Sequence, residues 1–437
     1  MISEMASGLQ FPMLDASPSV QKKVKIVYIV THPITLTSKM LDQIKHFSQL
    51  DFQVHVITSL DADFDLTGAR DVFTLHIVRM EREISLRHDF LALWQTFWLL
   101  RKLRPEIVNS STPKAGLVGS IAAWAACVPV RIYILRGLRY ETLSGVKRQV
   151  VKLCERIASI CATKVVAVSP SLRKIYLSER ICSEKKIVVL GEGSSNGLDA
   201  DKYDPAGNKE TIRRELRAKH GIPFDVPVVA YLGRFTNDKG FVELSDAVEH
   251  VLTAVPEAHF VLIGDFEDGD PVPSKCREFL EKNQRVTHVP FVANPASYYA
   301  MIDVLAFPSY REGLPVVPLE AAAAGIPTVA FNVTGSVDAV VHGETGTIVP
   351  LKDSRALAEA LIAYLKNCDL RAKHGRAAQD RVRKSFRQEV VWGHMEALYC
   401  GELKAVGSKT RSVADPAPSL HQPLDTDSPK EKHHRYN

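Results

Sequence analysis

Short runs of aliphatic residues alternate with amphipathic stretches between residues 22 and 180 of the chain. The runs are rich in β-branched residues, as buried strands are, and the stretches repeat apolar residues at helical spacing. The strands that this pattern predicts are 24–30, 54–57, 75–78, 131–135 and 165–168. The predicted helices are 38–50, 90–103, 116–126, 146–162 and 171–177. Strands that alternate with helices indicate a parallel sheet with helices on both faces.

A polar, glycine-containing stretch at 191–208 interrupts this alternation, which then starts again. Further strands are predicted at 226–232, 260–263, 286–289, 304–307 and 328–331, and helices at 242–255, 318–324 and 355–365. One hydrophobic core rarely organises more than about 250–300 residues, and this chain has 437. The fold class that we expect is therefore α/β, with two Rossmann-like parallel-sheet domains that face each other across a cleft.

The pattern divides the chain into five segments. We expect a flexible N-terminal segment at 1–21, an N-terminal domain at 22–205 and a C-terminal domain at 206–387. Residues 388–403 have helical spacing without a following strand, so this helix is a candidate for packing back on the N-terminal domain. Residues 404–437 are polar and nearly free of aromatic side chains, which predicts a disordered tail.

Composition and cysteine spacing narrow the class of protein. The hydrophobic fraction of 46% and the charged fraction of 24% are typical of a globular protein. The seven cysteines are scattered and form no C-x-x-C pair, which favours a reducing compartment and argues against structural zinc. The sequence shows neither a signal peptide nor a stretch long enough to span a bilayer, so we expect a cytoplasmic protein.

The positive charge is concentrated in one region. The net charge is only +5, yet residues 131–186 contain 13 Lys or Arg and 4 Asp or Glu. Such a region can favour nucleic acid, anionic lipid or a phosphorylated substrate, and a solvated surface explains many charge runs equally well. Charge alone does not choose among these alternatives.

The strongest local motif directly follows the predicted strand 226–232. Gly233 and Arg234 open it, and Lys239 and Gly240 close it just before a predicted helix. Glycines let the backbone approach a ligand closely, the helix N-terminus presents unpaired N–H groups, and two cations converge on the same point. This combination is suited to binding a diphosphate. A glycine-bounded turn with two solvated cations is the alternative interpretation.

A second motif carries two carboxylates after the predicted strand 304–307. Glu312 lies in the loop that Gly313 and Pro315 shape, and Glu320 lies about one turn inside the following helix. Both can face one ligand, and carboxylates accept strong hydrogen bonds from sugar hydroxyl groups. We therefore expect Glu312 to contact a hexose and Glu320 a ribose. A carboxylate stabilised by the helix dipole is the simpler explanation for either residue alone.

These two motifs, together with the Gly-Glu-Thr-Gly-Thr-Ile-Val-Pro segment at 343–350, resemble the retaining glycosyltransferase family 4, which has the GT-B fold. The resemblance implies that Arg234, Lys239 and Glu312 are the catalytic residues, with the two cations on the donor diphosphate and Glu312 on the donor sugar. It gives the ribose to Glu320. The donor-binding residues that it implies are Gly233, Arg234, Lys239, Gly240, Glu312, Gly313, Leu314, Pro315 and Glu320. No metal or other cofactor is expected, because the two cations can neutralise a departing diphosphate.

The first half resembles a narrower bacterial group that builds capsular, exopolysaccharide or O-antigen repeat units on a lipid carrier. The stretches that carry this resemblance are 36–40, 80–84, 112–116, 135–139 and 193–197. It implies an acceptor saccharide linked to a lipid diphosphate at the cytoplasmic face of the inner membrane, and no nucleic-acid partner. A UDP-sugar is the favoured donor, with GDP-mannose as the alternative. The loop at 31–35 departs from the family because it lacks a Gly-Gly pair, and no histidine lies at 109–111.

Several polar residues of the first half lie in the loops that follow its predicted strands. In open parallel sheets, the loops at the carboxyl ends of the strands face the crevice. The candidate acceptor-binding residues there are His32, Thr35, Lys114, Arg136 and Arg139. We expect the three cations among them to bind the acceptor diphosphate, although ordinary solvated cations would show the same pattern. For His32, a helix cap or a packing role is an alternative to chemistry.

The stretch 86–104 contains Trp94, Phe97 and Trp98 beside Arg and Lys residues. It could dock on an anionic membrane surface. A core helix that covers the sheet explains the same pattern, and for an α/β domain it is the favoured interpretation. Both interpretations hold together if one edge of the helix stays exposed.

Other functions fit the sequence less well. A metal-dependent transferase would use a D-x-D triplet such as 61–63 or 268–270, but such triplets arise readily in charged loops. A nicotinamide dehydrogenase would need glycines after the first strand, where the loop at 31–35 has none. A sugar-nucleotide epimerase or hydrolase of the same architecture, and a non-catalytic sugar-nucleotide-binding protein, remain alternatives to the transferase.

Overall fold

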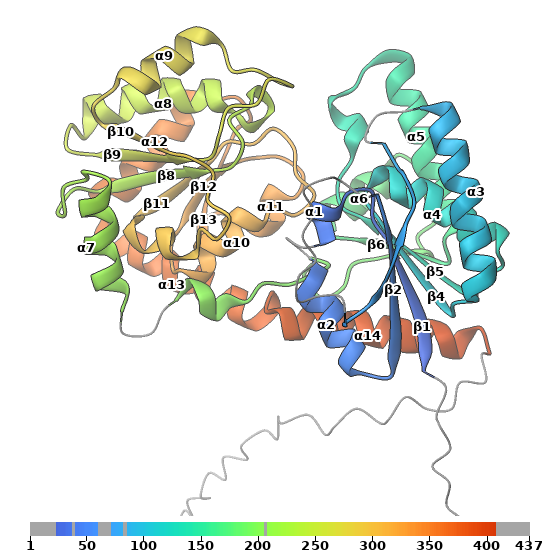
Figure 1. Ribbon diagram of the computed structural model, residues 1–437. Coiled ribbons are helices and arrows are strands. Elements are labelled where there is room, and N and C mark those ends of the chain that lie inside the picture. The colour runs from blue at the N-terminus through green and yellow to red at the C-terminus, as the bar shows by residue number, and fades with distance from the viewer. Residues whose placement is uncertain (1–22, 37–39, 60–70, 82–84, 205–207, 408–437) are drawn as a thin grey trace, which may run out of the picture.

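Two α/β halves lie side by side in the computed structural model of the protein (Figure 1). The structure describes residues 23–36, 40–59, 71–81, 85–204 and 208–407. Each half contains one sheet, and every strand pair in both sheets is parallel. The predicted pair of parallel sheets is therefore confirmed. The expected segment at 1–21 and most of the expected tail at 404–437 lie outside the described residues.

The first sheet has seven strands in the order β3-β2-β1-β4-β5-β6-β7. Their bounds are β1 Val24–Ile29, β2 Phe52–Thr58, β3 Thr74–Ile77, β4 Ile107–Ser111, β5 Val130–Leu135, β6 Lys164–Ala167 and β7 Ile187–Val188. β1 pairs with β2 on one side and with β4 on the other, with Ile26 opposite both Val54 and Ile107. The strand order thus reverses at β1, so the loops after β1 and β4 border the crevice where ligands bind in such sheets.

Helices cover both faces of this sheet. Their bounds are α1 Pro33–Thr35, α2 Leu41–Gln49, α3 Leu86–Leu103, α4 Pro113–Ala125, α5 Gly145–Cys161 and α6 Pro170–Ser178, with a 3₁₀ turn, η2, at Arg139–Thr142. α4 packs on the sheet with α3 on one side and α5 on the other. α2 contributes Ile44 and Phe47 to the core with Tyr28 of β1.

The second sheet has six strands in the order β10-β9-β8-β11-β12-β13. Their bounds are β8 Val228–Leu232, β9 His259–Ile263, β10 Val286–Val289, β11 Val304–Phe307, β12 Thr328–Phe331 and β13 Gly346–Val349. The helices are α7 Lys209–Lys219, α8 Phe241–Ala254, α9 Ser274–Lys282, α10 Val316–Ala323, α11 Ser336–Ala339, α12 Ser354–Lys366 and α13 Cys368–Ser385, with 3₁₀ turns η3 Ala200–Tyr203, η4 Asn237–Lys239 and η5 Ala296–Met301. This order reverses at β8, so the loops after β8 and β11 border the second crevice.

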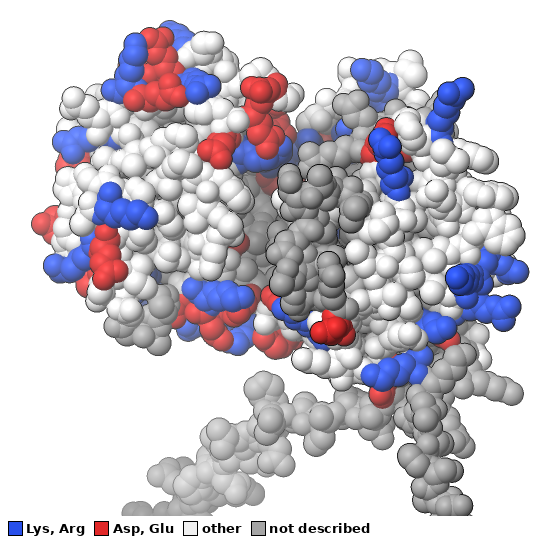
Figure 2. Space-filling view, in the orientation of Figure 1, with Lys and Arg blue, Asp and Glu red and all other residues white. Residues whose placement is uncertain are grey.

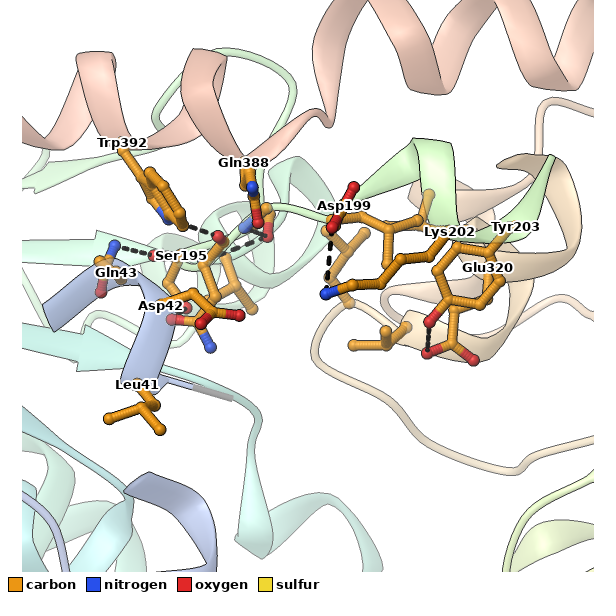
Figure 3. A pocket seen from close by; sticks show the side chains of 18 of the residues that line it. Leu41, Asp42, Gln43, Ser195, Asp199, Lys202, Tyr203, Glu320, Gln388 and Trp392 are labelled. Carbon is orange, nitrogen blue, oxygen red and sulfur yellow. Dashed lines mark hydrogen bonds and ion pairs between the residues drawn. The ribbon is translucent and has the colours of Figure 1, made fainter. Parts of the chain in front are cut away.

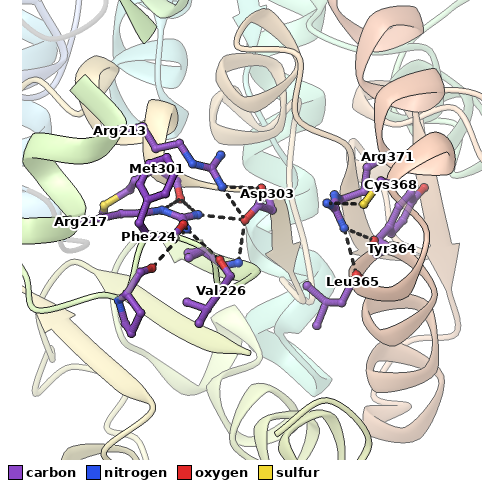
Figure 4. A network of polar contacts seen from close by, with 12 residues as sticks. Arg213, Arg217, Phe224, Val226, Met301, Asp303, Tyr364, Leu365, Cys368 and Arg371 are labelled. Atoms are coloured by element: carbon purple, nitrogen blue, oxygen red, sulfur yellow. Dashed lines mark hydrogen bonds and ion pairs between the residues drawn. The ribbon is translucent and has the colours of Figure 1, made fainter. Parts of the chain in front are cut away.

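A buried arginine ties α7 to this second sheet (Figure 4). The Arg217 side chain is 1% exposed and pairs with Asp303 at 3.0 Å. It also donates to the carbonyl oxygens of Met301, Phe224 and Val226. Asp303 in turn accepts from the Val228 backbone N–H at the start of β8. Because the buried charges are paired and hydrogen-bonded, removing one of them would leave the other uncompensated, which is strongly destabilising.

The last helix, α14 (Gln388–Ala405), packs against the first sheet although it follows the second. Met395, Tyr399 and Leu403 belong to the core of the first half. The Tyr399 hydroxyl accepts a hydrogen bond from the Asn109 side chain of β4. The Trp392 indole N–H donates to the carbonyl of Asn196, at 2.7 Å. The helix α14 therefore returns to the first half and links it to the second.

Several elements differ from those the pattern predicts. β4, β7, β13, α7, α9 and α13 were not among the predicted elements. The sequence of β4 ends in Asn109, Ser110 and Ser111, which are 2%, 1% and 0% exposed. A buried strand with polar residues escapes a search for apolar runs, because its polar groups depend on partners distant in the sequence.

Helix α3 has two unlike sides. Ala92, Thr96 and Leu100 are buried, as a core helix requires. Phe90, Trp94 and Trp98, however, are 64%, 54% and 53% exposed. The helix therefore covers the core with one side, as the favoured interpretation of 86–104 expects, and leaves the other side exposed. None of the helices within the described ranges is both long and apolar enough to cross a membrane.

Candidate active site

The two halves touch through the loops that follow their strands. The Arg136 carbonyl oxygen, just after β5, lies so close to Gly313 that a Cβ atom built there would be 1.9 Å away. The Ser169 hydroxyl, before α6, donates a hydrogen bond of 2.7 Å to the Gly313 carbonyl. The Ser171 hydroxyl, at the same helix start, accepts a hydrogen bond of 2.9 Å from the Gly335 backbone N–H. The loop that contains Gly313 therefore rests directly on the first half, and only glycine fits there.

Glycines also shape the loop after β8. Gly240 has a φ of 71°, and a Cβ atom there would lie 1.9 Å from the Pro308 carbonyl oxygen. The carbonyl oxygen of Gly233 would lie 1.9 Å from a Cβ atom on Gly264. These close approaches draw the loop after β8 against the ends of β9 and β11. The backbone of both predicted motifs is therefore brought to one edge of the second sheet.

Lys239 and Glu312 come from the two separate motifs and meet in this structure. The Lys239 Nζ lies 2.6 Å from Glu312 Oε1 and 3.3 Å from Ser309 Oγ. Ser309 also donates to Glu312 at 2.8 Å. The Lys239 and Glu312 side chains are only 20% and 15% exposed. A cation and a carboxylate that the sequence placed on different loops thus form one partly buried group.

Arg234 lies on the same loop as Lys239, but its guanidinium group points outward. Its Nη1 pairs with Glu267 at 2.7 Å, and the two side chains are 55% and 45% exposed. The carbonyl of Arg234 accepts a hydrogen bond of 2.7 Å from the Tyr231 hydroxyl. An exposed ion pair contributes little stability, so the guanidinium group could leave Glu267 for a stronger anion at small cost.

Two tyrosine hydroxyls hold the carboxylate of Glu320 in α10. Tyr203 donates to its Oε1 at 2.9 Å and Tyr299 to its Oε2 at 2.7 Å. Burial raises the pKa of both tyrosines, and the neighbouring Glu320 carboxylate raises it further, so both remain protonated donors. The sequence analysis missed both residues, because Tyr203 lies in the connection between the halves and Tyr299 in a turn without a motif.

A cavity of about 250 Å³ separates Glu320 from the first half. Figure 3 shows Tyr203 and Glu320 on one side of it, with Gln43 of α2 and Trp392 of α14 on the other. Leu314 lines this cavity and packs against the cores of both halves. The cavity therefore lies between the halves, next to the carboxylate that the sequence assigns to a ribose.

A second pocket, of about 590 Å³, contains all of the predicted acceptor-binding residues. Its lining consists of Thr31, His32, Thr35, Thr112, Pro113, Lys114, Arg136, Gly137, Arg139 and Arg311. Four of these side chains are Lys or Arg and none is acidic. The loops after β1, β4 and β5 thus converge as the topology predicts, and they create a strongly cationic pocket.

The cations of this pocket differ in their partners. Lys114 pairs with Asp89 of α3 at 2.7 Å. Arg136 donates to the Asn196 side chain at 3.3 Å, and burial lowers its pKa to about 10, which still leaves it charged at neutral pH. The Nε atoms of Arg136 and Arg311 are buried and have no hydrogen-bond partner among the described residues. The pocket thus holds donors that the protein itself leaves unused.

His32 and Thr112 occupy special backbone positions beside the pocket. The His32 Nδ1 atom accepts from the Ile34 backbone N–H at 3.3 Å, so this side chain caps α1. Thr112 has φ 75° and ψ 152°, a region that non-glycine residues rarely adopt and that costs about 1–3 kcal/mol. The Thr112 and Thr31 hydroxyls lie 2.7 Å apart. This hydrogen bond helps to hold Thr112 in its strained backbone conformation, which the sequence does not predict.

No group of three or more His, Cys, Asp or Glu side chains in the described part of the chain is arranged to hold a metal ion. Within the triplet at 268–270, the Asp270 carboxylate accepts a backbone hydrogen bond of 2.7 Å from Asp238. The triplet at 61–63 lies outside the described residues.

Family comparisons match both halves. A family model described as glycosyl transferases group 1 matches residues 212–381, and a glycosyl transferase 4-like domain matches residues 37–193. The capsular polysaccharide biosynthesis glycosyltransferase CapM of Staphylococcus aureus is 36% identical over 88% of this chain and 98% of its own length. An Escherichia coli protein, UDP-Gal:alpha-D-GlcNAc-diphosphoundecaprenol alpha-1,3-galactosyltransferase, is 25% identical over 79% of this chain and 88% of its own.

Solved structures share the fold at lower sequence identity. HepE from Anabaena, in complex with UDP and glucose, has a TM-score of 0.70 and 19% identity over 86% of this chain and 99% of its own. Sucrose-phosphate synthase from Thermosynechococcus elongatus has a TM-score of 0.72 and 21% identity over 88% of this chain and 100% of its own. Because the two sheets, the match of both family models and the similarity along the whole chain agree, this protein is a GT-B glycosyltransferase that belongs to the group 1 family, with a glycosyltransferase 4-like first half.

Proposed function

We propose that this enzyme is a retaining, metal-independent glycosyltransferase of bacterial surface polysaccharide synthesis. Its donor is a nucleoside diphosphate sugar, with a UDP-sugar favoured over GDP-mannose, and its acceptor is a saccharide linked to a lipid diphosphate. The names of the capsular relative and of the E. coli galactosyltransferase support the pathway, the donor and the diphosphate-linked acceptor. The complexes of HepE with UDP and with UDP-glucose support the same choice of nucleotide.

One observation carries the proposal, namely that two groups of different chemistry lie beside the same contact between the halves. The first is the Lys239–Glu312 ion pair on the second half. The second is the pocket with four cations and no acid in its lining. Gly313, which follows Glu312 in the chain, touches the carbonyl of Arg136, which lines that pocket. A sugar between them would have an activated diphosphate on one side and a second, lipid-borne diphosphate on the other.

The donor side has a residue for each part of a nucleotide sugar. Lys239 and Arg234 bind the donor diphosphate, Glu312 the sugar and Glu320 the ribose. The backbone N–H groups of Gly313 and Leu314 assist, and Gly233, Gly240 and Pro315 shape the loops around them. Glu320 is already oriented by two hydroxyl groups, which hold its carboxylate beside the cavity where a ribose would bind.

The proposed reaction exchanges one C–O bond for another at the anomeric carbon. The bond from this carbon to the diphosphate oxygen breaks, and the acceptor hydroxyl forms the new bond from the same face. Its proton passes to the departing diphosphate. Negative charge grows on that diphosphate in the transition state, where the Lys239 ammonium group contributes most. To do so, Lys239 exchanges its Glu312 partner for a phosphate oxygen, which leaves Glu312 free for the sugar.

The acceptor side is proposed to bind the lipid diphosphate with Lys114, Arg136 and Arg139, while His32 and Thr35 border the saccharide. The structure supports this grouping because all five line one pocket. Guanidinium groups match phosphate oxygens in a two-pronged geometry, and Arg136 retains unused donors for it.

We also propose that the first half contacts the anionic cytoplasmic face of the inner membrane. Exposed apolar side chains lie on α3, the end of α4 and α5, namely Phe90, Leu91, Trp94, Trp98, Trp124, Val146, Val150, Leu153 and Ile160. Figure 2 shows a largely uncharged surface on this half, bordered by Lys and Arg side chains. Exposed aromatic groups with flanking cations are typical of surfaces that dock on anionic lipid. The start of α4 carries Lys114 of the acceptor pocket, so docking would bring that pocket to the lipid.

A thermal-shift panel of UDP-, GDP-, ADP- and dTDP-sugars tests the donor, because a ligand that binds only the native state raises the melting temperature. Transfer to a prenyl-diphosphate-linked saccharide then tests the acceptor, and the anomeric configuration of the product, read by NMR, tests retention. Consumption of donor without acceptor would indicate a hydrolase or epimerase instead. Nucleotide binding without any turnover would indicate a non-catalytic binding protein.

A further inference from the structure

Arg311 belongs to the second half but lines the cationic pocket of the first. It is the single residue of the second half among those that line this pocket in the described structure. It directly precedes Glu312, the partner of Lys239. No role follows for it from the sequence motifs. Its position therefore joins the donor loop to the proposed acceptor pocket.

The guanidinium group of Arg311 is only loosely engaged by the protein. Its nearest acidic partner is Asp238, with 3.5 Å between Nη2 and the carboxylate, which is longer than a strong hydrogen bond. Its Nε is buried and has no hydrogen-bond partner among the described residues. A guanidinium group has five N–H donors, and a buried donor without a partner is costly, so an anion that enters the pocket could bind there. Arg136 in the same pocket also has an unused Nε.

The charges around Arg311 favour a polyvalent anion. Its neighbours in the lining are Lys114, Arg136 and Arg139. Acids do approach from outside the lining, since Asp89 pairs with Lys114 and Asp238 with Arg311. Burial raises the pKa of Glu141, and the Arg311 charge opposes that rise. None of these carboxylates lines the pocket. A diphosphate would reduce the repulsion among the four cations and accept from the unused Nε groups of Arg136 and Arg311.

We propose that Arg311 is a ligand of the acceptor diphosphate, so that the acceptor site is built by both halves. The inference rests on the proposed function, which places that diphosphate in this pocket, and adds a residue from the donor half. Arg136 and Arg139 bind the diphosphate from the first half, and Arg311 completes the site from the second.

A composite site couples acceptor binding to the arrangement of the two halves. Arg311 reaches the pocket because its loop rests on the first half through Gly313. If the halves move apart, Arg311 leaves with the donor loop, and the acceptor loses one of its cations. Binding of the acceptor diphosphate therefore favours the facing arrangement, in which donor and acceptor are aligned.

The experiment measures two ligands on the full-length protein. Farnesyl diphosphate is the probe for the acceptor pocket, titrated by calorimetry into protein saturated with the nucleoside diphosphate that gives the largest thermal shift. That nucleotide occupies the donor site and is also titrated separately. The variants are Arg311→Gln, Arg311→Lys and Arg136→Gln. Arg173→Gln is the matched control, because this side chain is 32% exposed against 34% for Arg311 and likewise pairs with a carboxylate.

Arg311→Gln is expected to weaken farnesyl diphosphate binding about tenfold or more, since a charge-assisted hydrogen bond is lost, and to leave nucleotide affinity within about twofold. Arg311→Lys should recover part of the loss, because the charge remains but the two-pronged geometry does not. Arg173→Gln should change neither affinity.

Two outcomes would overturn the inference. Unchanged farnesyl diphosphate affinity in Arg311→Gln, with a loss in Arg136→Gln, would leave the proposed acceptor pocket in place and remove Arg311 from it. An equal loss of both ligands in Arg311→Gln would assign this residue to the donor loop instead. If neither Arg136→Gln nor Arg311→Gln affected the probe, the acceptor pocket of the proposed function would itself be wrong.

Discussion

The two sides of the cleft hold their cations in different ways. On the donor side, Lys239 pairs with Glu312 at 2.6 Å and Arg234 with Glu267 at 2.7 Å. On the acceptor side, Lys114 is also paired, with Asp89 at 2.7 Å. Arg136, however, has only an amide partner, and Arg139 forms no ion pair within the described residues. The donor side is thus locally neutral without a ligand, whereas the acceptor side carries an excess of positive charge.

This difference indicates two ways of binding a diphosphate. Under the proposed function, the donor site would exchange an internal carboxylate for a phosphate, so its net gain would be reduced by the ion pairs that it breaks. The exchange would also free Glu312 when the donor arrives. The proposed acceptor site has unused arginine donors from the start, so it would attract an anion over a distance and depend more on salt.

The prediction with the largest expected effect tests whether Lys239 exchanges Glu312 for a phosphate of the donor. Lys239→Ala should lower the turnover number by roughly 10²-fold or more, because the cation acts on charge that develops in the transition state. Steady-state kinetics would measure it, with circular dichroism to show an intact fold. Lys275→Ala, at an exposed lysine of the same half, is the control and should have no effect. Turnover near that of the wild type in Lys239→Ala would remove this residue from the mechanism.

The next effect separates binding from catalysis on the same side. Glu320→Ala should raise the donor KM by about 10- to 30-fold with little change in kcat, since ribose contacts are similar in the ground and transition states. Tyr299→Phe should shift KM in the same direction by less, because Tyr203 still holds the carboxylate. Glu249→Ala, at an exposed acid of α8, serves as control. A donor KM that did not move in Glu320→Ala would contradict the ribose contact.

A third effect concerns the surface around the acceptor side. The double change Trp94→Ser and Trp98→Ser should weaken binding to phosphatidylglycerol vesicles by about tenfold, because exposed aromatic area is lost. Co-sedimentation with vesicles measures it. Phe291→Ser removes an aromatic side chain that is 72% exposed on the second half and should change nothing. An equal loss of vesicle binding in both variants would mean that the protein does not dock on vesicles specifically through the first half.

The smallest effect tests the salt dependence of the acceptor side. Arg139 is exposed, so its charge is well screened by water and ions. Arg139→Gln should raise the acceptor KM only about threefold at low salt, because an exposed ligand of the diphosphate is screened, and the difference from wild type should shrink towards about 0.5 M salt. Kinetics at a series of salt concentrations would measure this. A difference from wild type that did not change with salt would contradict an exposed, screened contact between Arg139 and the diphosphate.

The residues of the proposed donor side could be predicted from the sequence because they lie within two short motifs. Lys239 and Glu312 could be assigned to one ligand before any coordinates, and the structure brings them together. The residues of the proposed acceptor side could be grouped only from the expected sheet topology, since they follow three different strands. Knowing that loops after parallel strands converge was sufficient to group Lys114 with Arg136, but not to add Arg311 from the other half.

By itself, the sequence determined the two parallel sheets and the residues of the proposed donor loops, because hydrophobic periodicity and glycine-bounded motifs are local properties. Only the tertiary structure decided what those groups contact. It turned Arg234 outward to Glu267, held Glu320 between two tyrosines, left the tryptophans of α3 exposed and carried Arg311 into the pocket of the first half. Each of these outcomes depends on a neighbour far away in the chain, and the packing of whole elements decides which neighbour that is.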